Sequence, residues 1–125
     1  MKRKIYNEML LWKQNAQGKS ALMIDGARRI GKSYIVEEFA KNEYKSYILV
    51  DFNNADDNLI EIFNKYLGNL DVFFSYLALY YNVTLYHRDT LIVFDEVQLY
   101  PKARAAIKYL VKDGRYDYIE TGSLV

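Results

Sequence analysis

The chain has 125 residues, 51% of them hydrophobic, and a formal net charge of +1. This length and composition predict one globular domain over residues 1–125 and argue against intrinsic disorder. The absence of cysteine excludes disulfides, thiolate zinc sites and thiol nucleophiles.

The first part of the chain predicts two strands, each followed by helical segments. Residues 21–25 and 46–52 are short, continuous apolar runs, which are typical of strands buried on both faces of a parallel sheet. Residues 31–42 place apolar side chains four positions apart, and the segments 59–66 and 73–80 carry apolar stripes with helical spacing.

The second part of the chain continues the alternation. Residues 90–96 form another continuous apolar run, and residues 116–122 form a weaker one. Between them, Pro101 suits the first turn of a helix because its missing N–H needs no partner there, and Gly114 suits the helix end. The alternation predicts a three-layer α/β fold, with helices on both faces of a mostly parallel sheet of about four strands.

A phosphate-binding motif joins the first predicted strand to the first predicted helix. Residues 26–33, GARRIGKS, fit G-x-x-x-x-G-K-[ST], the Walker A pattern. The glycines let backbone N–H groups point inward as a nest for phosphate oxygens, and the helix dipole adds positive potential. The expected nucleotide-binding residues are Gly26, Ala27, Arg28, Arg29, Ile30, Gly31, Lys32, Ser33 and Tyr34.

Two residues of this motif have chemical roles beyond cradling the phosphates. Lys32 would reach the β- and γ-phosphates of ATP and is therefore a candidate catalytic residue, and Ser33 would offer its hydroxyl to Mg²⁺. We interpret Arg28 and Arg29 as solvated charges that attract the nucleotide. The alternative is that one of them contacts a neighbouring subunit or the transferred phosphate.

Two acids end the third predicted strand. Ligands of open parallel sheets bind outside the carboxyl ends of the strands, so Asp95 and Glu96 should face the phosphate loop. Asp95 would then hold Mg²⁺ in the manner of a Walker B aspartate, and Glu96 would orient and deprotonate an attacking water. The alternative is that both acids only end the strand and cap the segment that follows.

Polar residues near two other strand ends are weaker candidates. Thr121 and Ser123 lie at the tip of the last predicted strand, which we expect beside the strand of the acid pair, and could bond the attacking water or the γ-phosphate, although an ordinary turn would have the same composition. Asp51 ends the second strand, where a capping or supporting role is the better interpretation. His87 is the single histidine, and we interpret it as structural or exposed.

Charge and hydropathy limit the partners. Residues 1–33 carry a balance of +6, which suits a solvated helix plus the phosphate loop better than DNA contact, although DNA contact stays open. The most apolar segment, residues 72–83, falls short of the roughly 20 residues that span a membrane. With no signal-peptide pattern at the start, we expect a soluble, cytoplasmic protein that makes no membrane contact.

The segments GARRIGKS, IVFDEVQ and TGS together resemble the P-loop ATPases of the AAA+ superfamily, in the bacterial and archaeal group called AAA domain 14. The resemblance covers nearly the whole chain. It implies a P-loop NTPase core of the AAA+ (ASCE) type that binds ATP and Mg²⁺, with the roles given above for the loop and the acid pair and a sensor role for Thr121 or Ser123. It also implies a fifth strand, a helical lid and a further domain after Val125, so we expect this chain to be the N-terminal portion of such a protein.

These observations favour an ATP-binding domain with Mg²⁺-dependent hydrolysis, which the later segments or neighbouring subunits of a homo-oligomer would complete. The alternative is a nucleotide-dependent switch that holds a protein partner without efficient hydrolysis. A small-molecule kinase fits less well, because kinases of this class carry an arginine-rich lid that the sequence does not contain.

Overall fold

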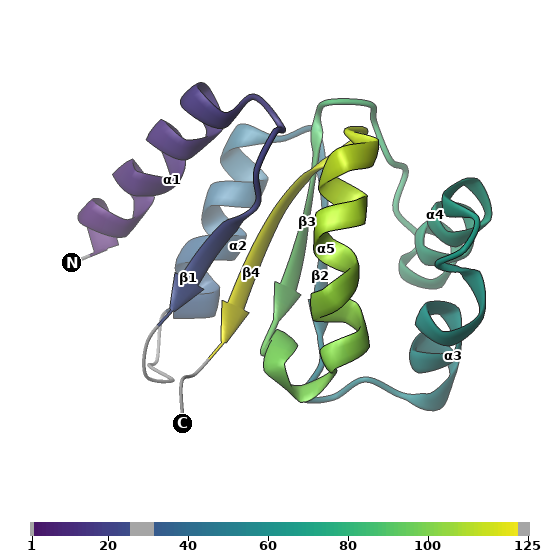
Figure 1. The fold of residues 1–125 in the computed structure, drawn as a ribbon. Coiled ribbons are helices and arrows are strands. Elements are labelled where there is room, and N and C mark those ends of the chain that lie inside the picture. Colours follow the sequence, from purple (N-terminus) through teal and green to yellow (C-terminus); the bar gives the residue numbers. More distant parts are fainter. Residues whose placement is uncertain (1, 26–31, 123–125) are drawn as a thin grey trace.

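A four-stranded parallel sheet forms the centre of the computed structural model, which describes residues 2–25 and 32–122 (Figure 1). The strands run in the order β1-β4-β3-β2, and every described pair is parallel. The predicted α/β fold with its mostly parallel sheet is confirmed. The strands are β1 (Leu22–Asp25), β2 (Ser46–Asp51), β3 (Thr90–Asp95) and β4 (Asp117–Gly122).

Helices connect these strands, and the four predicted helical segments are present within a few residues of their expected bounds. One further helix, α1, precedes the first strand, in the basic region where a solvated helix was expected without defined bounds. The helices are α1 (Lys2–Ala16), α2 (Lys32–Glu43), α3 (Asp57–Tyr66), α4 (Leu70–Tyr81) and α5 (Pro101–Asp113), with a short 3-10 turn, η1 (Val97–Leu99), before α5.

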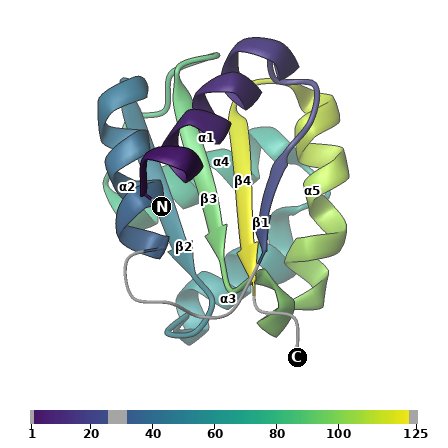
Figure 2. The same cartoon turned by 90° about the vertical axis from the view of Figure 1, so that its left-hand side faces the viewer.

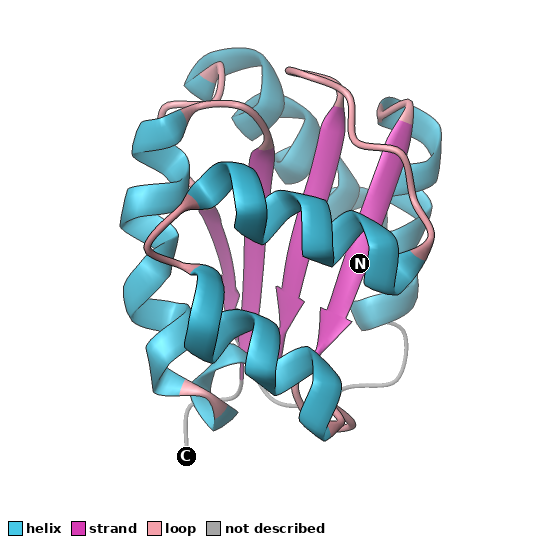
Figure 3. Cartoon of the chain, turned by 90° about the vertical axis from the view of Figure 1, so that its right-hand side faces the viewer, coloured by secondary structure: helices cyan, strands magenta, loops and turns pink. Residues whose placement is uncertain are grey.

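The path of the chain explains why helices cover both faces of the sheet. From β1 the chain crosses to the far edge at β2 through α2, and it then returns through β3 to β4. Crossovers between parallel strands keep one hand, so a reversal of direction moves the connecting helices to the other face. Figure 2 shows α1 and α2 in front of one face of the sheet. Figure 3 shows the opposite face, which α3 and α4 of Figure 1 cover.

Alternate residues of β3 face the two halves of the core. Leu91 and Val93 pack in the cluster formed with α1 and α2, whereas Ile92 and Phe94 pack in the cluster formed with α3, α4 and α5. All four side chains are at most 1% exposed. The continuous apolar run in the sequence therefore reflects a strand that is covered on both faces.

Candidate functional site

The carboxyl ends of the four strands meet at one edge of the sheet (Figure 1). Register aligns Asp25 of β1 with Gly122 of β4, and Asp51 of β2 with Asp95 of β3. The polar residues predicted from separate strands therefore reach the same edge. We call this region the carboxyl edge.

The start of α2 lies at the carboxyl edge as well (Figure 1). Its first two residues, Lys32 and Ser33, belong to the predicted phosphate motif, and Tyr34, also predicted to bind nucleotide, is 57% exposed. The remainder of the motif, Gly26, Ala27, Arg28, Arg29, Ile30 and Gly31, lies outside the described residues, as does Ser123. The strand, motif and helix thus follow one another in the order that a phosphate loop requires.

β4 separates the strand before the motif from the strand that ends in the acid pair. Neighbouring strands lie about 4.8 Å apart, so β1 and β3 are separated by roughly 10 Å at the carboxyl edge. The end of β4 lies between the predicted phosphate motif and the acid pair. Thr121, near that end, is only 1% exposed.

The hydroxyl of Thr121 joins the two acids of the predicted pair. It donates a hydrogen bond to Oδ1 of Asp95 and accepts one from the backbone N–H of Glu96 at 3.2 Å. A hydroxyl has a single proton to donate, so Thr121 could donate to a phosphate oxygen only after releasing Asp95. Its remaining lone pair can still accept a hydrogen bond from water.

Glu96 has an unusual backbone conformation and an unusual environment for a carboxylate. Its φ of 57° and ψ of 46° lie in the left-handed region, which residues other than glycine seldom adopt. The side chain is also buried, with only 8% of the residue exposed. Residues held in this region cluster at functional sites. The turn aims the chain away from the strand directly after Asp95.

Gln98 completes the described part of the site and was not among the predicted site residues. Its Nε2 donates a hydrogen bond to Oε1 of Glu96 at 2.7 Å. The sequence signal was present in the segment LIVFDEVQ, where a polar residue follows the acid pair by two positions. Spacing alone could not show that the turn at Glu96 brings the two side chains together.

The other polar candidates from the sequence lie in different surroundings. The carboxylate of Asp51 accepts hydrogen bonds from the backbone N–H of Asn53 and from Nδ2 of Asn54, at 2.9 and 2.8 Å. This is the capping role that the sequence favoured. His87 is exposed in the connection before β3.

The donors at the carboxyl edge suit Mg²⁺ better than a metal that needs a protein cage. Within the described residues, no group of three or more His, Cys, Asp or Glu side chains could hold a metal ion. Mg²⁺ usually binds one or two carboxylates together with substrate phosphates and waters. Asp95, whose carboxylate Thr121 orients, is a carboxylate of that kind.

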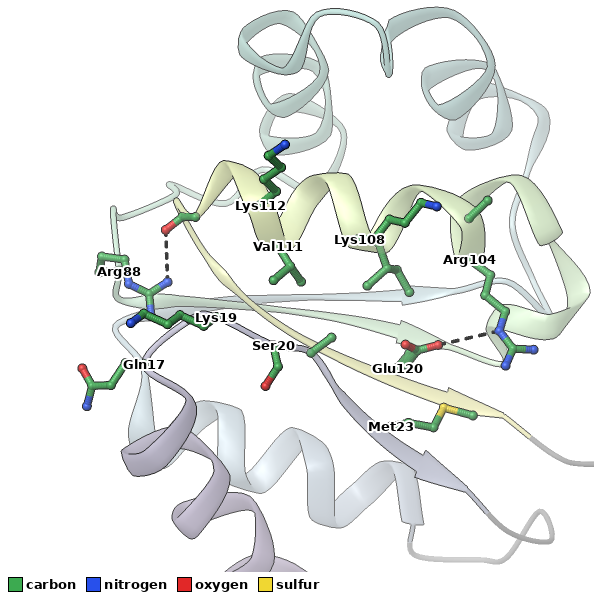
Figure 4. Close-up of a pocket in the computed structure, with 15 residues that line it drawn as sticks. Gln17, Lys19, Ser20, Met23, Arg88, Arg104, Lys108, Val111, Lys112 and Glu120 are labelled. Atoms are coloured by element: carbon green, nitrogen blue, oxygen red, sulfur yellow. Dashed lines mark hydrogen bonds and ion pairs between the residues drawn. The ribbon is translucent and has the colours of Figure 1, made fainter.

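A cavity of about 980 Å³ lies away from the acid pair, between β1 and α5 (Figure 4). Basic side chains from both ends of α5 and from the loops line it, among them Lys19, Lys108 and Lys112. Glu120 also lines it, 4.0 Å from Arg104, and burial raises the pKa of this carboxyl group. The cavity does not include Asp95 or Glu96, so it is separate from the candidate site.

Comparisons with known proteins add one finding. A family model described as an AAA domain matches residues 18–125, which include all four strands and every site residue named above. Searches of curated proteins and of solved structures found no match. In the described part of the chain, no helix is long and apolar enough to cross a membrane.

Proposed function

The chain belongs to the AAA domain family, and from this premise we propose that it binds ATP with Mg²⁺ at the carboxyl edge and supports hydrolysis of the terminal phosphoanhydride bond. Family membership supports nucleotide binding in general. Hydrolysis and the individual residue roles are our proposal.

One observation carries the proposal: Thr121 holds the carboxylate of Asp95 and the backbone of Glu96 together, at the edge where α2 begins. The spacing of roughly 10 Å between β1 and β3 supports a phosphate chain that lies across the end of β4. The phosphate motif on one side and the acid pair on the other would then contact the same triphosphate.

The proposed roles follow from the chemistry of each side chain. Backbone N–H groups of residues 26–33 would bind the phosphate oxygens, and the ammonium group of Lys32 would balance charge on the β- and γ-phosphates. Ser33 and Asp95 would hold Mg²⁺, which neutralises charge on the phosphates when it is bound. Arg28, Arg29 and Tyr34 would lie beside the nucleotide.

Hydrolysis needs a base for the attacking water. The carboxylate of Glu96 would accept a proton from that water as the water oxygen forms a bond to the γ-phosphorus. The bond from the γ-phosphorus to the bridging oxygen breaks, its electron pair stays on ADP, and inorganic phosphate leaves. Two observations support this role: Glu96 follows Asp95 directly, and Gln98 donates a hydrogen bond to its carboxylate.

The first test separates binding from chemistry. We expect Glu96→Gln to keep the ATP affinity within about twofold and to lower steady-state phosphate release at least about 100-fold, as expected for loss of a general base. ATP affinity is measured by calorimetry with Mg²⁺ present, and phosphate release by a coupled assay. Lys32→Ala should weaken ATP binding itself.

Each of the other outcomes points to a different function. ATP binding without phosphate release in the wild type would favour the nucleotide-dependent switch, and transfer of phosphate to a nucleoside or metabolite would indicate a kinase. A rate of phosphate release per chain that rises with protein concentration would support a homo-oligomer in which neighbouring subunits share sites. Unchanged ATP affinity in Lys32→Ala would contradict the proposed site.

A further inference from the structure

We propose that Gln98 is a positioning residue that fixes the carboxylate of Glu96 for activation of the attacking water. The inference rests on the proposed function, because it assigns a supporting role within the same site. Gln98 would not touch the nucleotide. It would act only through Glu96.

The contact between the two side chains is direct. Nε2 of Gln98 lies 2.7 Å from Oε1 of Glu96, in the short η1 turn that follows the left-handed residue. An ionised carboxylate can only accept hydrogen bonds, so the nitrogen of the amide must face it. A hydrogen bond to an ionised group is also stronger than one between neutral groups.

This bond would orient the whole carboxylate. A carboxylate is planar, so a partner that holds one oxygen also limits the directions in which the other oxygen can accept a proton. Among the described residues, the bond from Gln98 is the one hydrogen bond to the Glu96 carboxylate. Oε2 would then accept from a water molecule, in a direction that Gln98 sets.

The other end of the Gln98 amide makes no stabilising hydrogen bond. Its Oε1 is buried and has no hydrogen-bond partner, which is a destabilising arrangement. The amide nitrogen, which bonds Glu96, therefore makes the one side-chain hydrogen bond of Gln98 among the described residues.

Gly122 of β4 provides the space for this amide. A Cβ atom added at Gly122 would lie 2.5 Å from Oε1 of Gln98, closer than real atoms approach. Gly122 has no positive φ that would demand glycine. A side chain at Gly122 would therefore force the flexible Gln98 amide to shift, which gives a second way to disturb the contact.

The main test is Gln98→Met, which keeps a side chain of similar length and removes both the donor and the unpaired oxygen. We expect kcat for ATP hydrolysis to fall about 10- to 100-fold, as expected for a misplaced catalytic group, with KM and ATP affinity within about twofold of the wild type. The midpoint of urea unfolding should stay the same or rise. A residue with only a structural role would not lose activity while keeping or gaining stability.

Two further variants serve as comparisons. Gly122→Ala should lower kcat in the same way, and combining it with Gln98→Met should lower kcat no further, because both act on one contact. Leu99→Met changes the neighbouring residue, which is 52% exposed, and should leave kcat unchanged. A wild-type kcat in Gln98→Met would overturn the proposal.

A measurement that needs no turnover distinguishes failure of this inference from failure of the proposed function. In the ¹⁵N-labelled chain without nucleotide, the side-chain amide protons of Gln98 should exchange slowly, and Glu96→Ala should remove this protection. If the wild type binds ATP but releases no phosphate, the proposed hydrolysis fails. The exchange of the Gln98 amide protons then tests, by itself, whether Gln98 holds the Glu96 carboxylate. Fast exchange in the wild type would then overturn the role of Gln98.

Discussion

Thr121 links two strands through a single hydroxyl group. The hydroxyl donates to the carboxylate of Asp95 and accepts from the N–H of Glu96, and the residue is almost fully buried. The N–H of Glu96 follows directly after β3 and precedes η1. The hydroxyl therefore satisfies a backbone group that regular structure leaves unpaired.

We expect Thr121→Val to lower the free energy of unfolding by about 1 to 3 kcal/mol, because it leaves the buried N–H of Glu96 without a partner. Thr121→Ser keeps the hydroxyl and loses one methyl group, so it should cost only about 1 kcal/mol. Urea unfolding of the two variants measures the difference. A smaller loss in Thr121→Val than in Thr121→Ser would show that the methyl group, and not the hydroxyl, stabilises this position.

The residues of the candidate site differ in how far the sequence could predict them. The acid pair and Thr121 follow from strand ends, because parallel strands bring their carboxyl ends to one edge. The sequence did not predict the contact of Gln98 with Glu96, since it depends on a left-handed turn at a residue that is not glycine. Periodicity carries no signal for such a turn. The roles assigned to these residues stay predictions.

Helix α1 has a buried face that its basic composition does not indicate. The segment carries several basic residues near its start, yet Met9 is fully buried and Tyr6 packs edge-on against Phe39 of α2 at 5.5 Å between ring centroids. The hydroxyl of Tyr6 also donates a hydrogen bond to Glu43 at 3.0 Å. The helix is thus one part of the core on the α2 face.

We expect Met9→Ala to lower the free energy of unfolding by about 2 to 4 kcal/mol, because it opens a cavity between α1 and the sheet. Leu11→Ala is the matched control, since Leu11 is 57% exposed on the same helix and should cost less than about 0.5 kcal/mol. Thermal or urea unfolding measures both. A similar small loss in both variants would mean that α1 does not contribute to the stability of the domain.

The predicted elements agree with the structure where local pattern decides them. Continuous apolar runs marked the four strands, and Pro101 and Gly114 marked the ends of α5, with Gly114 in the left-handed conformation at the helix end. A solvated helix was expected within residues 1–33, and the buried face of α1 was not predicted because that face is narrow and the segment is basic. A narrow face becomes visible only once its partner helix is placed.

At the scale of the whole molecule, a cluster of polar side chains lies at the amino ends of the strands, opposite the candidate site. Asp117, at the start of β4, accepts hydrogen bonds from Tyr44 and Arg88, both at 2.6 Å. Burial, together with the bond to Asp117, raises the pKa of Tyr44 far above its ordinary value. Arg88 also bonds the carbonyl of Gly114, so the cluster joins α2, α5 and β4.

We expect Asp117→Ala to lower the free energy of unfolding by about 2 to 4 kcal/mol, because it leaves Tyr44 and Arg88 without their acceptor. ATP affinity should change less than about twofold, since the cluster lies at the far end of the strands. Glu61→Ala breaks an exposed ion pair with Lys65 and should cost about 0.5 kcal/mol or less. A large loss of ATP affinity in Asp117→Ala would show that the two edges are coupled.

The pairing of β1 with β4 was not predicted from the sequence, because it joins segments that are far apart in the chain. β1 pairs with β4 across nearly a hundred residues, and no short pattern encodes that partnership. The prediction that Thr121 lies beside the acid-bearing strand is confirmed by the pairing of β3 with β4.

The interior place of β4 has a consequence for synthesis on the ribosome. β4 is the last described strand to emerge, yet in the described sheet β1 touches no other strand. Until residues 117–122 have left the exit tunnel, β1 has no strand to pair with. The proposed site at the end of β4 is then incomplete. Nascent chains arrested before that residue should therefore fail to retain ATP, whereas release of the whole of β4 should confer retention abruptly.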